Sequence, residues 1–173
     1  VINQVVTNGA YLYSAAGCVT SIVYSGAGFT NTTALNWNSQ YQLESIFTNS
    51  VECECNGFDA LGRRVWTATS DDGEAWTTNY FVYDGNQIIA EVNAEGTLQR
   101  NYVWGPGIDN LLAMTVYTVS STNTYYALTD HLGTVHALTD SSGAIVESYR
   151  FDAWGRVLGV YNGSGQPLTE SAV

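Results

Sequence analysis

A short motif recurs along the whole chain: an aromatic or large apolar residue leads into a short polar residue, and a hydrophobic strand-like run follows. The polar residues of the seven copies are Ser14, Asn38, Asp59, Asp84, Asp109, Asp130 and Asp152. Successive copies lie 24, 21, 25, 25, 21 and 22 residues apart. Self-similarity at a period of about 20 to 50 residues is typical of repeat architectures. The chain is therefore expected to be one unit copied several times, and not an enzyme built around a single site.

The last copy shows what each unit encodes. Tyr149 and Phe151 share one face of an extended segment, and a second apolar run follows at 157–160. Between them, the Asp152 carboxylate is placed to accept hydrogen bonds from the backbone amides just ahead of it, and Gly155 supplies a positive φ. The pattern predicts a strand, a tight turn and a second strand.

Each unit also carries a second turn signal at its other end. These signals are Asp72-Gly73, Glu95-Gly96, Ser142-Gly143 and Asn162-Gly163. Two turns per period give two strands per period, so we predict an all-β fold: an antiparallel β-hairpin repeat array of about seven hairpins and about 14 strands. One domain is expected over 1–173, with repeats near 1–30, 31–50, 51–75, 76–98, 99–122, 123–145 and 146–173.

Some copies depart from the pattern. Ser14 and Asn38 replace the acid but keep a side-chain acceptor, and the Asn38 copy lacks the loop glycine. In the fifth copy Gly105 occupies the usual acidic place and four residues precede Asp109 as an insertion. A longer loop or a bulge is expected there.

Composition excludes several classes of partner. The chain has 173 residues, is 45% hydrophobic and contains two prolines, which predicts a folded, strand-rich domain with a substantial core. The chain has five basic residues, all of them arginines, and 16 acidic residues, which gives a net charge of −11. Such a chain repels phosphate, so neither nucleic acid nor an anionic membrane surface is an expected partner. No apolar run reaches the roughly 18 residues of a membrane span, so membrane insertion is not expected.

The three cysteines leave two alternatives open. Cys53 and Cys55 lie on the same face of a strand, about 7 Å apart, which is too far for a direct bridge without strain. A bridge from Cys18 to either of them would suit secretion, whereas thiols buried as small hydrophobic groups are the favoured interpretation. No zinc site is expected, since structural zinc needs about four ligands and the two histidines lie far away in sequence.

No residue is nominated for catalysis, for a cofactor or for a metal. His131 and His136 would point to opposite faces of an extended segment, and no Gly-x-Ser-x-Gly elbow is present. Turn acids of successive copies would lie about 9.6 Å apart, too far to share an ion. The residues singled out are structural turn residues: Ser14, Asn38, Asp59, Gly62, Asp84, Asp109, Asp130, Gly133, Asp152 and Gly155.

These units resemble the YD/RHS repeat proteins. The resemblance is carried by the run 129–135 (TDHLGTV) and by 149–158 (YRFDAWGRVL), and it covers essentially the whole chain. It implies a hairpin array that spirals into a hollow shell, as in bacterial RHS effectors and insecticidal toxin complexes, which enclose a toxin, and in the extracellular barrel of teneurins. It also implies a bacterial protein located outside the cell or at its surface. No Asp-Pro dipeptide marks a cleavage region, so the family's autoproteolysis is not expected here.

The predicted function is therefore structural and non-enzymatic. The chain begins at Val1 without methionine, which suggests a processed product or a piece of a longer polypeptide. It is expected to serve as extracellular wall or fibre material, self-associating through its first and last hairpins, or as a shell segment of a larger RHS-type chain. Lysines, a common guard on exposed sheet edges, are absent. The alternative is an adhesin-like module that binds glycans or proteins through exposed Tyr and Trp.

Overall fold

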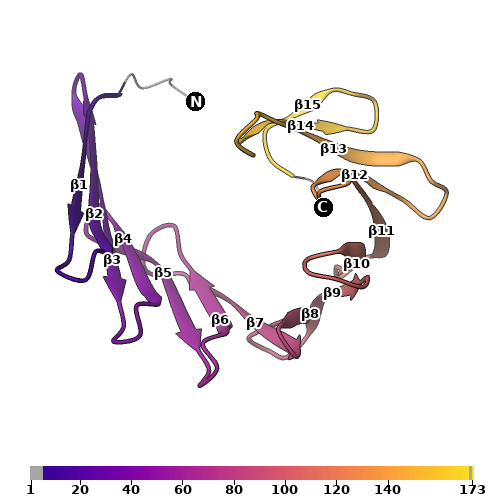
Figure 1. Cartoon of the computed structure of the whole chain (residues 1–173), viewed down its shortest axis with the longest axis horizontal. Coiled ribbons are helices and arrows are strands. Elements are labelled where there is room, and N and C mark those ends of the chain that lie inside the picture. The colour runs from indigo at the N-terminus through magenta and orange to yellow at the C-terminus, as the bar shows by residue number, and fades with distance from the viewer. Residues whose placement is uncertain (1–5, 172) are drawn as a thin grey trace. The chain divides into compact units, whose positions relative to one another are not determined.

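The computed structural model describes residues 6–171 and 173; positions 1–5 of the first predicted repeat and Ala172 of the last lie outside the described residues. The described part contains 15 strands and no helix. Each strand is hydrogen-bonded to the next one along the chain, so the order of the sheet is the order of the sequence (Figure 1). The predicted all-β antiparallel hairpin array is confirmed, with fifteen strands in place of about fourteen.

The chain forms two compact units, Val1–Phe81 and Val82–Val173. The prediction of one repeat domain over 1–173 stays a prediction. The first unit holds β1 (Val6–Tyr13), β2 (Val19–Gly26), β3 (Phe29–Trp37), β4 (Leu43–Thr48), β5 (Val51–Phe58), β6 (Arg64–Thr69) and most of β7 (Thr77–Asp84). The second holds the end of β7, then β8 (Gln87–Asn93), β9 (Leu98–Trp104), β10 (Leu111–Tyr117), β11 (Thr122–Thr129), β12 (Val135–Thr139), β13 (Ile145–Phe151), β14 (Val157–Asn162) and β15 (Pro167–Leu168).

The strands bend where they meet the turns. Between β5 and β6 the register shifts by one residue between Gly57 and Phe58, just before the Asp59 turn. The same shift occurs between Arg150 and Phe151, before the Asp152 turn. A bulge of this kind increases the local twist of the strand. The turn and its bulge therefore form one local unit that recurs along the sheet.

Each unit is a single layer of sheet with little interior of its own. The buried hydrophobic residues are Ala68, Ala113, Ala137 and Leu138. Most large side chains keep part of their surface exposed, as the strand β7 shows with its alternation of exposed and half-buried positions. The expectation of a substantial core is wrong for the described residues, because apolar content becomes a core only when a second layer covers it.

Candidate functional site

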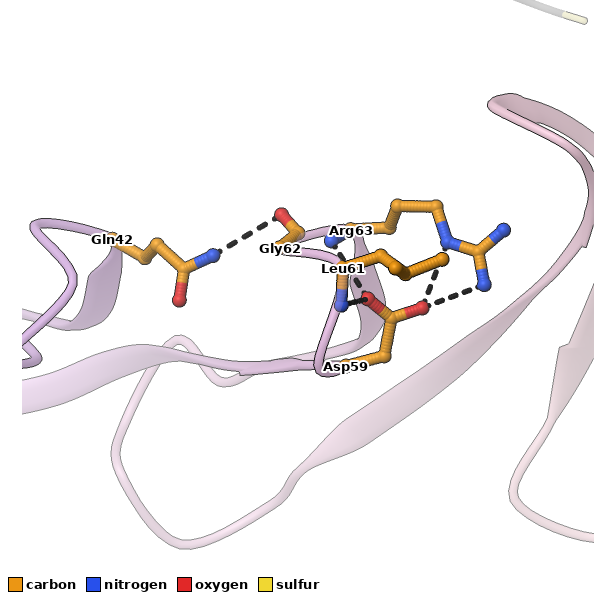
Figure 2. Close-up of polar contacts among 5 residues, drawn as sticks. All are labelled: Gln42, Asp59, Leu61, Gly62 and Arg63. Carbon is orange, nitrogen blue, oxygen red and sulfur yellow. Dashed lines mark hydrogen bonds and ion pairs between the residues drawn. The ribbon is translucent and has the colours of Figure 1, made fainter.

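The hairpin turns are the one feature that the sequence repeats, and Asp59 shows how they are built (Figure 2). Asp59 Oδ1 accepts hydrogen bonds from the backbone N–H groups of Leu61 at 2.9 Å and Arg63 at 3.0 Å. The Asp59 N–H donates to the Arg63 carbonyl, and the Gly62 N–H donates to the Asp59 carbonyl. Gly62 has φ +83°, the left-handed conformation that closes a short hairpin loop with a glycine bulge. One carboxylate thus organises five residues of backbone.

Five of the seven predicted polar residues form this same backbone loop: Ser14, Asn38, Asp59, Asp130 and Asp152. Gly133 and Gly155 take the place of Gly62 in the Asp130 and Asp152 turns, with φ +85° and +83°. In the Asn38 turn, which lacks the glycine, Tyr41 adopts φ +62° instead. The chain therefore forms the same backbone loop with different residues at its first and fourth positions.

Asp84 and Asp109 lie in turns of a different kind. Asp84 ends β7, and only two residues separate it from β8, with Gly85 at φ +58°. The fifth copy has the expected longer loop of six residues between β9 and β10, closed by a hydrogen bond from the Gly105 N–H to the Asn110 carbonyl. Asp109 contributes its backbone, with φ +52° and a carbonyl that accepts from the Leu111 N–H.

Three further turns of the Asp59 kind close hairpins at the other end of the strands. They begin at Asn93, Asp140 and Asn162, whose side-chain oxygens each accept two backbone N–H groups. Sequence reasoning placed a turn signal in each of these segments and named Asn162, which it paired with Gly163, but it did not single out Asn93 or Asp140. The signal that finds them is a glycine three residues after Asn or Asp, at Gly96, Gly143 and Gly165.

In two of these turns an arginine side chain forms an ion pair with the turn aspartate. The Arg63 guanidinium contacts Asp59 Oδ2 at 2.7 Å, and Arg156 contacts Asp152 Oδ2 at 3.2 Å. The backbone N–H of Arg63, followed by its side chain and the N–H of Leu61, lowers the pKa of Asp59. For Asp130, the N–H groups of Leu132 and Thr134 and the His136 side chain lower the pKa in the same way. The loops that Asp59 and Asp130 close therefore favour the anionic form of these two carboxylates.

One side-chain hydrogen bond links two neighbouring turns of the first unit. Gln42 Nε2 donates to the Gly62 carbonyl at 3.1 Å, which ties the Asn38 turn to the Asp59 turn (Figure 2).

Within residues 6–171 and 173, no group of three or more His, Cys, Asp or Glu side chains is placed to hold a metal ion. The same part of the chain has no helix long and apolar enough to cross a membrane.

The two histidines belong to the second unit and the three cysteines to the first. His136 Nε2 lies 3.1 Å from Asp130 Oδ2, and its ring meets Phe151 edge-on at 5.7 Å. His131 is exposed within the Asp130 turn. Cys18, Cys53 and Cys55 are free thiols and half-buried, so no bridge from Cys18 is formed. Burial, together with a hydrogen bond to Glu52, raises the pKa of Cys55 to about 11.

The structure contains a buried carboxylate that the sequence did not predict. Glu147, on β13, has no exposed surface and accepts a hydrogen bond from Ser171 Oγ at 2.8 Å. Burial and the neighbouring Glu147 raise the pKa of Tyr149 two residues along the same strand face. Glu91 has a related surrounding, since Tyr102 Oη donates to it. Nothing in the local sequence distinguishes these glutamates from exposed ones.

Several aromatic residues stabilise the sheet itself. The indole N–H of Trp37 on β3 donates to the Val19 carbonyl on the neighbouring strand β2 at 2.7 Å. In the same way the indole N–H of Trp104 on β9 donates to the Ile88 carbonyl on β8 at 2.7 Å. The Arg150 guanidinium stacks over the Tyr161 ring at 4.6 Å. These side chains are therefore already engaged within the sheet.

A sequence model described as "Teneurin YD-shell" matches residues 4–164, which is nearly the whole hairpin array. The chain belongs to the teneurin YD-shell family. The resemblance to YD/RHS repeat proteins predicted from the turn residues is thereby confirmed, and the array is a shell-type repeat structure.

Known relatives of this YD-shell chain are far longer than it is. The tRNA3(Ser)-specific nuclease WapA of Bacillus spizizenii is 32% identical over 100 residues, which are 57% of this chain and 4% of WapA. The Photorhabdus luminescens Tc holotoxin pore superposes with a TM-score of 0.55 and 13% identity over 90% of this chain. The TcdB2-TccC3 crystal structure gives 0.56 and 12% over 91%. Each match spans 10% of the solved chain, and at these identities it shows a shared fold.

Proposed function

We propose that this YD-shell chain is a non-enzymatic wall segment. The observation that carries the proposal is that each unit is one layer of hairpins, and that five of the seven repeated polar residues form the hydrogen bonds that close its turns. A single-layer sheet with part-exposed faces encloses or covers something else, because it buries little of its own apolar surface. The family match over 4–164 supports the same role.

The best-ordered carboxylates of residues 6–171 and 173 already have partners within the chain. Those of Asp59 and Asp152 bind the backbone and an arginine of their own turns. Glu147 is enclosed and bound to Ser171. WapA is named as a nuclease, but the matching segment is 4% of that protein, so its activity is not assigned to this chain.

The wall segment acts within a larger RHS-type chain or with further copies of itself. In the described part of the sheet, β1 lies at one edge and the two-residue β15 at the other. Exposed edge strands are templates for pairing with another strand. Copies joined through the first and last hairpins would extend the wall, and we place this material outside a bacterial cell or at its surface.

Electron microscopy of the purified chain tests the wall role. The expected particles are strips, curved shells or filaments whose wall is one sheet thick, about 10 Å. Compact particles with two packed sheets would contradict it. Nuclease, protease and glycosidase assays on the same preparation should give no turnover, and hydrolysis that a turn-acid variant abolishes would overturn the non-enzymatic assignment.

A second candidate function is adhesin-like binding of glycans or proteins. The observation that favours it is the exposure of aromatic side chains in the turns, with Tyr41 64% and Trp154 90% exposed. Aromatic rings of this kind stack on sugar rings or on peptide partners. Saturable binding on a glycan array that is lost in Tyr41→Ser or Trp154→Ser would support this function, and an array without binding would count against a glycan ligand.

A further inference from the structure

A hollow in the second unit has the size of a binding pocket. Its volume is about 620 Å³, and it lies between the turns 93–97 and 118–121, which join β8 to β9 and β10 to β11. Pockets for small ligands measure about 300–1,000 Å³. Backbone hydrogen bonds close both turns. The hollow is therefore formed before any ligand arrives, so that binding would order little further chain.

The side chains that line this hollow are all uncharged, among the residues that the structure describes. Asn93 and Gln99 supply amides, Tyr117 supplies an aromatic ring, and Leu98 and Val119 supply aliphatic surface, with two threonines completing the lining. The hollow thus offers hydrogen bonds and apolar contact without a cationic anchor. Phosphates, nucleotides and carboxylate ligands need such an anchor, so they do not fit this site.

The two amide side chains each keep one group for a ligand. Asn93 Oδ1 accepts the backbone N–H groups of Glu95 and Thr97, so Nδ2 is the group of this amide that remains to donate. Gln99 Nε2 donates to the Thr97 carbonyl at 3.2 Å, so Oε1 is the group that remains to accept. The hollow therefore presents a donor and an acceptor together with the Tyr117 ring.

A neutral sugar matches this set of groups. Its hydroxyls donate and accept hydrogen bonds, and its apolar ring face packs on an aromatic side chain. An acidic sugar is disfavoured, because the chain has a net charge of −11. A peptide strand would instead add to a sheet edge. The edge strands of the described sheet are β1 and β15, whereas the hollow lies at the ends of the interior strands β8 to β10.

A second hollow of related composition follows the turn 118–121. It has a volume of about 330 Å³, and β11 lines it with Asn123, Tyr126 and neighbouring residues. The Tyr126 side chain is 45% exposed. Asp140 also lines this hollow, but its carboxylate already accepts two backbone N–H groups of its own turn. Two such hollows beside one turn favour a ligand of several sugar units over a single sugar.

We propose that the hollow between the turns 93–97 and 118–121 binds a neutral oligosaccharide. One sugar ring lies against Tyr117, and its hydroxyls bind Asn93 Nδ2 and Gln99 Oε1. This site goes beyond the wall role stated above. It is also separate from ring stacking on Tyr41 and Trp154, the side chains on which the second candidate function depends.

A glycan array probed with the full chain tests the class of ligand. The array carries neutral oligosaccharides of glucose, galactose and N-acetylglucosamine, together with sialylated forms of the same chains. Saturable binding to at least one neutral oligosaccharide is expected, with weaker binding to its sialylated form. Binding to none of the neutral oligosaccharides, or to the sialylated forms alone, would overturn the proposal.

Asn93→Asp removes the donor from the hollow and keeps the turn, because Asp140 closes a turn of the same kind. This variant and, separately, Gln99→Leu should each weaken binding of the neutral oligosaccharide by about tenfold or more in titration calorimetry, since each loses a ligand hydrogen bond. Asn38→Asp makes the same exchange in a turn of the first unit and should leave the affinity unchanged. Circular dichroism should show the same strand content in all three variants.

The variants Tyr41→Ser and Trp154→Ser separate this site from the second candidate function. If either of them abolishes glycan binding while Asn93→Asp and Gln99→Leu keep it, the hollow is not the binding site and the exposed rings are. If the Asn93 and Gln99 variants alone lose binding, the site in the hollow stands. Electron microscopy decides the wall role in either case.

Discussion

The indole ring of Trp66 lies over Gly57, its cross-strand partner on β5. A methyl group at Gly57 would meet Trp66 Nε1 at 1.9 Å. We therefore expect Gly57→Ala to displace the indole and to lower the free energy of unfolding by about 1–3 kcal/mol, as overpacking does. Urea denaturation followed by tryptophan fluorescence measures the change.

Gly9 provides the matched control for Gly57. It also faces an aromatic partner, Tyr24, but a methyl group there would lie 3.6 Å from the ring, at ordinary contact distance. Gly9→Ala should therefore change stability by no more than about 0.5 kcal/mol. Equal losses in the two variants would show that the contact with the indole does not decide the effect.

The Asp59 turn depends on its side-chain oxygen more than on its charge. Asp59→Asn keeps an acceptor for the Leu61 and Arg63 amides, as Asn38 does in its own turn, and loses the ion pair with Arg63. Asp59→Ala loses both. We expect denaturation midpoints in the order wild type, Asn, Ala, with the larger step between Asn and Ala. An Asn variant as unstable as the Ala variant would assign the effect to the charge.

Acid should unfold the array through its turn aspartates. The folded loops lower the pKa of Asp59, Asp72, Asp130 and Asp140. The unfolded chain then binds more protons in this range, so stability is complete above the unfolded pKa, about 3.9, and falls as the pH drops through the folded values. Urea midpoints between pH 6 and pH 2.5 measure the loss. Asp59→Asn should show a smaller loss than wild type, and an equal loss would exclude Asp59 as a source.

Tyr41 is strained in the place where other turns have glycine. Its φ is +62°, and its side chain is exposed, so its ring contributes little packing. The left-handed conformation costs a residue with a Cβ roughly 1–2 kcal/mol, and replacing Tyr41 by glycine removes this cost. Part of the gain in stability is offset because glycine loses more entropy on folding. Tyr41→Gly should thus raise the free energy of unfolding by about 0.5–1 kcal/mol in urea denaturation. Tyr41→Ala keeps the Cβ and should give no comparable gain.

Cys55 should react slowly while the protein is folded. Its pKa is raised to about 11, chiefly by burial. At pH 8 its thiolate is then on the order of a hundredfold scarcer than in an unfolded chain, where the thiol pKa is about 8.5. Iodoacetamide labelling with peptide mass spectrometry should show this slowing in native protein and its loss in urea. Native labelling as fast as in urea would contradict the buried environment.

The fold was predictable wherever its cause is local. Asp59 and Gly62 lie three residues apart and close their loop with bonds inside five residues, so the sequence pattern alone indicates the hairpin. The same rule, an Asn or Asp followed three residues later by Gly, would have found Asn93. Asp84 comes after an aromatic residue, as the pattern requires, but its glycine is the next residue and not the third one along. Gly85 therefore favours a two-residue loop in place of the longer loop of the Asp59 turn.

The amino-acid sequence by itself determined the hairpin array, because turns and strand alternation depend on neighbours a few residues away. Only the tertiary structure decided which side chains are covered. Glu147 is enclosed because Ser171, 24 residues later, returns to it, and Trp154 is exposed because its turn projects beyond the strands. Burial depends on which segments are brought together in space, and a repeating local pattern contains no record of that.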